Sequence, residues 1–502
     1  HLLGMAESAV QQSETEPALR FYPGPTIDTH AHLVQAAYAV YDVQIDSVKD
    51  IPELIQLIRE RALVTPEGTW IRTSAAWHEM NLKERRFPTA KELDAATTKH
   101  PILVKRGGHN DVVNSMALKI AGITKDTPDP KGGTIVRDKN GEPNGWLIQS
   151  AAQQLVERFI PSLPTEKQIE GARLAALNFA AQGITTVRDG AVGKDEMLSL
   201  LQGPWEKGNL PIRVRAMISL IRGTVPEQIA AIDGWGVSSG FGDDFLRIWG
   251  LKVVMDGGAE AAALLEPYAN KPGYKGFLFW KSEDLIQVAN HAVRRGWKIG
   301  THCVGDLAVK TILDVYERVI QDNSDLPHGM LVLEHAFLAD KEQRSRAIRL
   351  GIPVTIQYPP IYTLGAELVE NFGEQRASTL LPVRKWIDEG AQVSAGSDYP
   401  AGQSNPLRSV WGLVTRQTGG NGIVGGENAI TREEAFKLYT SEAAKFLGEE
   451  NSIGSLEPGK LADFVAYEKD PFICSDEELK ELDPLLTVVD GKAVYDPNHI
   501  LN

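Results

Sequence analysis

The sequence predicts an α/β protein built on a (β/α)8 TIM barrel, with a large insertion after the first barrel strand and a small β-rich appendage at the chain ends. Three observations support this fold class. Short β-branched runs alternate with helical patterns, which is typical of parallel βαβ units. Eight such runs can be counted, the number that closes a barrel. A long mixed segment separates the first run from the second, and a turn-rich segment follows the last.

The first barrel strand is the apolar run that ends in Ile27–Leu33, and little sequence precedes it. Residues 1–20 are interpreted as a tag remnant, His1–Gly4, followed by a flexible lead-in, because they are polar and aperiodic. We therefore assign residues 21–452 to the barrel with its insertion.

The insertion spans residues 34–165, which is too long for a simple crossover between neighbouring strands. It contains turn signals at Pro66–Gly68, Arg106–Gly108 and Lys131–Gly133. Because it follows a barrel strand directly, we interpret it as a cap over the barrel mouth, where its loops would set substrate choice. The alternative is a separate amino-terminal domain.

The other seven strands and the helices between them follow from hydrophobic periodicity. The strands are predicted at Ile184–Arg188, Ile212–Leu220, Ile248–Met255, Lys298–Cys303, Met330–Glu334, Pro353–Gln357 and Gln392–Ala395. The helices are predicted at Glu166–Ala181, Glu283–Arg295, Leu307–Gln321, Lys341–Leu350 and Pro382–Glu389.

Residues 453–502 differ in character from the barrel. The segment begins with the turn-rich Gly454–Lys460 and continues with two β-branched runs, Ala462–Tyr467 and Leu486–Tyr495. The second run is interrupted by Asp490-Gly491, a strong hairpin signal. We expect these residues to form part of a small β domain outside the barrel.

Composition excludes several classes of protein. Asp and Glu total 66 against 52 Lys and Arg, a net charge of −14, so a basic nucleic-acid-binding face is not expected. With only two cysteines, neither a disulfide framework nor a cysteine-rich zinc site can hold the fold. No apolar run approaches the ~20 residues that a membrane-spanning helix needs, and we expect a cytoplasmic location.

Four histidines and an aspartate lie at the ends of predicted strands. His30 and His32 are two residues apart, so their side chains share one face of a strand, together with Asp28. His302, His335 and Asp398 each follow a separate apolar run. Strand ends are where barrel enzymes carry their active sites, and imidazole and carboxylate are ligands of zinc and similar divalent metals. A single such histidine would be read as a structural residue, but the set predicts a metal site.

Lys252 lies in the fourth strand, where the odd-numbered positions are all apolar and suit the outer face. Lys252 therefore falls on the inner face, where an unpaired lysine is costly. One interpretation is a buried ion pair with Asp256 or another carboxylate. The other is a lysine with a lowered pKa that adds carbon dioxide, giving an anionic carbamate able to bridge two metals.

The chain resembles the amidohydrolase superfamily, in particular the amidohydrolase family 3 group that includes N-substituted formamide deformylases. The resemblance runs nearly end to end. It rests on Pro23–His32, Arg106–His109, Gly183–Val187, Leu251–Gly257, His302–Asp306, Glu334–Ala336, Gly396–Pro400 and Gly454–Asp463.

This resemblance implies a binuclear centre with two divalent metal ions, for which we expect zinc. One metal would be held by His30, His32 and Asp398, and the other by His302 and His335, with carboxylated Lys252 between them. His109 corresponds to a family histidine in the insertion and would contact the substrate or the transition state, the alternative being a structural histidine of a loop. Asp256 and Gln357, at the end of their strands, are predicted as further substrate contacts.

The implied activity is that of a metal-dependent amidohydrolase, which cleaves an amide-like C–N bond of a small molecule, other than a peptide bond, by a metal-bridging hydroxide. Asp398 would take the proton of this hydroxide and return it to the leaving nitrogen, while His109 would stabilise the oxyanion. Ester or lactone hydrolysis and metal-dependent decarboxylation are alternative reactions for the same site. A further alternative is a non-catalytic binding protein whose barrel has lost its enzymatic activity. No nucleic acid or membrane partner is expected, and a homodimer is one option for the assembly.

The sequence departs from the family pattern in two places. Only about twenty residues precede the first strand, so the small β domain must be incomplete or built differently. After Asp256 the family commonly has a polar stretch with serine and arginine, whereas this chain has Gly257–Ala263, which is mostly glycine and alanine. The second departure suggests a different, partly apolar pocket.

Overall fold

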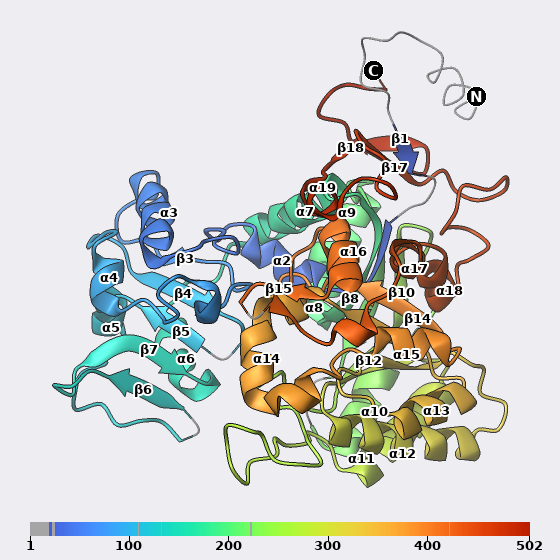
Figure 1. Cartoon of the computed structure of the whole chain (residues 1–502), viewed down its shortest axis with the longest axis horizontal. Helices are drawn as coiled ribbons and strands as arrows, with labels where there is room; N and C mark the ends of the chain where they lie inside the picture. Colours follow the sequence, from blue (N-terminus) through green and yellow to red (C-terminus); the bar gives the residue numbers. More distant parts are fainter. Residues whose placement is uncertain are drawn as a thin grey trace. The chain divides into compact units, whose positions relative to one another are not determined.

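The computed structural model describes residues 20–22, 26–108, 110–131, 133–220, 223–420 and 422–501. Its central element is a sheet of eight parallel strands in which each strand pairs with the next one in sequence (Figure 1). The strands are β2 (Thr26–Ala31), β8 (Ile184–Val192), β9 (Arg213–Ser219), β10 (Leu246–Val254), β11 (Ile299–Cys303), β12 (Leu331–His335), β13 (Val354–Gln357) and β14 (Val393–Gly396). This order confirms the predicted TIM barrel.

Helices follow most of these strands, and the five predicted helices are confirmed within a few residues at their ends. In α12 (Asp306–Asp322), buried Ala308, Ile312 and Val315 recur at helical spacing and form the face that packs inward. Figure 1 shows α11, α12 and α13 side by side along the barrel. The barrel helices are α7 (Thr165–Ala181), α10 (Val225–Asp233), α11 (Ser282–Arg294), α12, α13 (Lys341–Arg349), α14 (Pro359–Ala377), α15 (Val383–Asp388), α16 (Pro406–Thr415), α17 (Arg432–Leu438) and α18 (Ser441–Leu447).

The barrel seam is the junction between the last strand, β14, and the first, β2. It is held by individual hydrogen bonds and not by a regular ladder between the strands. Asp398 N donates to His30 O over 2.7 Å. The Oδ1 atom of Asp28 accepts from His30 N at 3.0 Å and from Ser397 N at 3.1 Å. Thr29 Oγ1 donates to Ala395 O at 2.9 Å. The seam therefore fixes the first and last strands against each other beside the predicted ligands.

Gly396 is required by this close approach. A Cβ atom at this position would lie 2.5 Å from His30 N and 2.7 Å from Asp28 Oδ1, closer than packed atoms allow. We expect Gly396→Ala to destabilise the protein by about 1–3 kcal/mol, the usual cost of overpacking, as measured by the denaturant midpoint. Gly426→Ala is the control, because its Cβ would meet only a methyl group of Ile423, at 3.2 Å. Equal stability of the two variants would contradict this account of the seam.

The segment between β2 and β8 contains a separate five-stranded sheet, which confirms an insertion after the first barrel strand. Residues alternate between its two faces. Leu103 and Val113 pack with helices α5 and α6, whereas Val104 and Val112 pack in a cluster with residues of α3. Its order is β3 (Ile71–Arg72), β4 (Ile102–Arg106), β5 (Asn110–Val113), β7 (Pro143–Ile148) and β6 (Thr134–Arg137). The helices of the segment are α2 (Leu33–Ala39), α3 (Ile51–Leu63), α4 (Ala90–Asp94), α5 (Ser115–Ala121) and α6 (Ser150–Glu157).

A four-stranded antiparallel sheet joins the two ends of the chain. It is formed by β1 (Arg20–Tyr22), β17 (Phe464–Tyr467), β18 (Pro484–Val489) and β19 (Lys492–Tyr495), with α19 (Asp476–Glu481) between β17 and β18. The predicted Asp490-Gly491 turn is confirmed, with φ angles of 53° and 72°, as a type I′ turn requires. Among the described residues, the segment before the first barrel strand contributes one strand, β1, which pairs with β17.

Among the described residues, no helix combines the length and the apolar character needed to cross a membrane.

Candidate metal centre

The strand-end residues predicted from the sequence lie close together at the C-terminal end of the barrel strands. Nε2 of His32 is 3.0 Å from Oδ1 of Asp398, and Nε2 of His30 is 3.4 Å from the same oxygen. The rings of His30 and His335 have centroids 4.6 Å apart, as do the rings of His302 and His335. Parallel strands bring their C-terminal ends to one edge, so residues distant in sequence form one cluster.

One part of this cluster has the composition and spacing of a metal site. His30, His32 and Asp398 each offer a ligand atom, and these atoms lie within 4.8 Å of one another. Beside them, the buried Nδ1 of His335 has no hydrogen-bond partner in the described part of the chain. A buried nitrogen without a partner is costly, and a metal ion would satisfy it. The donor set therefore fits a divalent metal of the zinc type.

The backbone at two of these residues lies in a sparsely populated conformation. His335 has a backbone φ of 72° and Asp398 has one of 57°. Both lie in the left-handed region that residues other than glycine rarely adopt. Backbone hydrogen bonds hold both segments in place. Ala336 N donates to Cys303 O, and Asp398 N donates to His30 O. Strain that the surrounding structure maintains is concentrated at functional sites.

The protonation states at the cluster suit metal binding. Burial, with the nearby charge of Lys252, lowers the pKa of His302 to about 4. Burial and the neighbouring His302 hold the pKa of His335 well below its usual value. Burial alone would raise the pKa of Asp398, but the hydrogen bonds to His30 and His32 outweigh it and hold this pKa well below its usual value. Neutral imidazoles and an ionised carboxylate are the forms that bind metal.

Lys252 lies in β10 and is buried, with its Nζ 3.4 Å from Nε2 of His30. Burial lowers the pKa of its amine, although Glu334 and Asp398 act in the opposite direction. In the described part of the chain, Lys252 forms no ion pair with Asp256 at bonding distance. The carboxylate of Asp256 instead accepts from the backbone N–H groups of Ala263, Val304 and Gly305, each at 2.9 Å.

The predicted substrate contacts have different surroundings. Asp256 is engaged by backbone donors and stabilises the loops that follow β10 and β11. Gln357 is fully buried, and while its Nε2 donates to Thr355 Oγ1 at 3.1 Å, its Oε1 has no partner among the described residues. His109 lies outside the described residues. The assignment of all three as substrate contacts stays a prediction.

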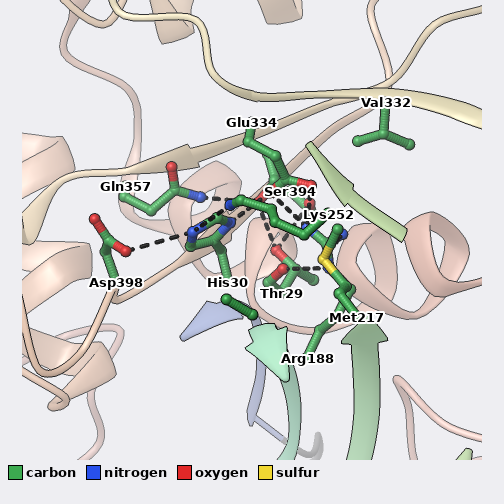
Figure 2. Close-up of polar contacts among 12 residues, drawn as sticks. Thr29, His30, Arg188, Met217, Lys252, Val332, Glu334, Gln357, Ser394 and Asp398 are labelled. Carbon is green, nitrogen blue, oxygen red and sulfur yellow. Dashed lines mark hydrogen bonds and ion pairs between the residues drawn. The ribbon is translucent and has the colours of Figure 1, made fainter. Parts of the chain in front are cut away.

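Two buried residues beside the cluster were not singled out from the sequence. Glu334 contacts His30, and Arg188 contacts Glu334 (Figure 2). Glu334 was part of the motif Glu334–Ala336, but no role was assigned to it, and the signal from the pattern was a charged residue at the end of each of two apolar runs, Ile184–Arg188 and Met330–Glu334. A charged residue in such a run is rarely buried without a partner, but the run does not indicate which partner it has.

Comparisons with known proteins agree with this geometry. The model of the amidohydrolase family matches residues 23–495. N-substituted formamide deformylase of Arthrobacter pascens is 30% identical over 489 residues, covering 94% of this chain and 87% of that protein. Putative amidohydrolase YtcJ of Bacillus subtilis is 28% identical over 485 residues, covering 95% and 89%. An uncharacterised metal-dependent hydrolase from Pyrococcus horikoshii shares the fold, with a TM-score of 0.69 at 24% identity, covering 92% of this chain and 88% of that one.

Proposed function

This chain belongs to the amidohydrolase family, and we propose that it hydrolyses an amide-like C–N bond of a small molecule at the cluster around His30 and Asp398. Family membership makes it a metal-dependent hydrolase that acts on C–N bonds. The observation that carries the proposal is the convergence of His30, His32 and Asp398 within 4.8 Å at the barrel mouth.

The proposed centre binds two metal ions, for which we favour zinc. His30, His32 and Asp398 would hold one ion, and His302 and His335 would hold the other. Because the second pair offers only two ligands, a carbamate on Lys252 would supply it with a further, anionic ligand. Bound divalent ions lower the pKa of water and polarise a carbonyl group.

Asp398 is the proposed general base. Its carboxylate lies beside two imidazoles, and its pKa is held well below the usual value. It would accept a proton from the attacking water at a carboxylate oxygen and donate the same proton to the leaving nitrogen. A leaving amine needs such protonation because an amide anion is a poor leaving group.

The remaining contacts would position the substrate. His109 would donate a hydrogen bond to the oxygen that becomes negative in the transition state. The free Oε1 of Gln357 would accept an N–H group of an amide substrate. Asp256, which follows β10, would be the third substrate contact.

A screen of metal-loaded protein tests this function. N-substituted formamides come first because the Arthrobacter relative is named for deformylating them, followed by other N-acyl amines, cyclic amides, esters, lactones and carboxylic acids. We expect turnover of a C–N substrate, loss of turnover after chelation, and recovery with zinc. Turnover of esters or lactones alone would identify an esterase or lactonase, and carbon dioxide release a decarboxylase. Protein that purifies without metal and turns over nothing would indicate a binding protein.

A further inference from the structure

Glu334 is a buried carboxylate that faces a predicted metal ligand. It lies at the penultimate position of β12 and has no exposed side-chain surface. Its Oε2 forms a short hydrogen bond with Nδ1 of His30. At neutral pH an ionised carboxylate only accepts hydrogen bonds, so Nδ1 of His30 is the donor.

Arg188, on β8, fixes Glu334 in place. Its Nη2 lies 2.8 Å from Oε1 and 2.7 Å from Oε2 of Glu334, and its Nε donates to Thr29 O at 2.6 Å. The guanidinium also lies against two aromatic rings, with 4.3 Å to the centroid of Trp249 and 4.9 Å to that of Phe446. These contacts restrain the side chain of Arg188, which is fully buried.

The two ring nitrogens of His30 consequently have different neighbours. Nδ1 faces Glu334, whereas Nε2 faces Asp398 and Lys252, each at 3.4 Å (Figure 2). A neutral imidazole carries one proton. If Nδ1 holds that proton, the lone pair of Nε2 is directed at the centre of the cluster.

We propose that Glu334, held by Arg188, is a positioning residue that fixes His30 in the tautomer whose Nε2 binds the metal. The proposal rests on the metal-dependent function proposed above. Outer carboxylates that accept from a ligating histidine orient its ring and increase its basicity, and their loss typically weakens metal binding by about 10–100-fold.

Glu334→Gln tests the proposal with little change of shape. Glutamine is neutral and replaces one carboxylate oxygen by an NH2 group, which would face a donor of either Arg188 or His30, so one contact becomes unfavourable. We expect the zinc dissociation constant, measured by competition with a chromophoric chelator, to rise by about 10–100-fold. Glu334→Asp keeps the charge and should retain tighter binding than Glu334→Gln.

Glu449→Gln is the matched control. Glu449 forms a similar two-oxygen pair with Arg215, at 2.5 and 2.7 Å, and does not touch the cluster residues. A purely structural effect of losing a buried ion pair would weaken zinc binding equally in both variants. Such equality, or an unchanged dissociation constant in Glu334→Gln, would overturn the proposal.

The tautomer itself gives a readout that needs no metal. In 15N-histidine spectra of the metal-free protein, we expect His30 to be protonated at Nδ1, with its signals assigned by their absence in His30→Asn. A proton on Nε2 instead would disprove the positioning role even if the enzyme is active. A proton on Nδ1 in a protein that binds no zinc would support the contact between His30 and Glu334 but reject the metal-dependent function. Failure of the positioning role and failure of the proposed function are therefore distinguishable.

Discussion

Lys252→Ala should lose bound metal and hydrolytic activity together, by more than the roughly 10–100-fold typical of an outer partner. In the proposed modification, the neutral Nζ of Lys252 would attack the carbon of carbon dioxide, form an N–C bond and lose a proton, which gives a carbamate anion. Burial lowers the pKa of this amine, which favours the neutral, nucleophilic form. Without the carbamate, the proposed second ion would be left with only His302 and His335. Metal content by elemental analysis and turnover are the measurements.

Lys298→Ala is the control for Lys252→Ala. Lys298 is a half-buried lysine whose pKa is lowered mainly by burial, and it lies just before β11, at the opposite end of that strand from His302. We expect this variant to retain its metal. Added short carboxylic acids, such as acetate, should partly restore both metal and activity to Lys252→Ala but not change Lys298→Ala. Full metal content and wild-type turnover in Lys252→Ala would reject the carbamate.

Asp398→Asn should reduce kcat by about 10²- to 10⁴-fold, the range for loss of a general base. The asparagine oxygen can still face a metal, but it cannot accept the proton of the attacking water. The backbone bond from residue 398 N to His30 O is unaffected by the change, so the seam should stay closed. Rates are compared at matched metal content, which separates loss of the base from loss of the ion.

Asp340→Asn serves as the control for this charge removal. Asp340 caps helix α13 through a bond to Gln343 N, and asparagine is an equally good cap, so wild-type kcat is expected. A kcat of Asp398→Asn within a few-fold of wild type would remove Asp398 from the catalytic role. His109 and Glu260, the one acidic residue of the Gly257–Ala263 segment, would then be the bases to test.

The barrel and the cluster were predictable because each rests on a local pattern. An apolar run followed by His302 or His335 marks a strand end, and parallel strands place such ends at one edge. The role of Glu334 was not predictable in the same way. Its contact with His30 joins β12 to β2, and only the closed barrel brings those strands within reach.

The positions of short elements without a repeating hydrophobic pattern could not be predicted from the sequence either. Strand β1 has three residues, Arg20–Tyr22, too few to show a periodicity of two, so the sequence predicted an appendage at the chain ends but not the residues of its N-terminal strand. The sheet of the insertion begins with the two-residue β3 and mixes parallel with antiparallel pairs. Its order depends on tertiary packing, because runs of this length do not specify a partner.

The seam between β2 and β14 also determines when the site can exist during synthesis. The ribosome makes the chain from the N-terminus, so His30 and His32 emerge early, whereas Asp398 emerges only after about four fifths of the chain. Until then, His30 and His32 lack the carboxylate that completes the cluster. The cluster of His30, His32 and Asp398 is therefore assembled by the same late event that closes the barrel, so a nascent chain cannot complete it before folding is nearly finished.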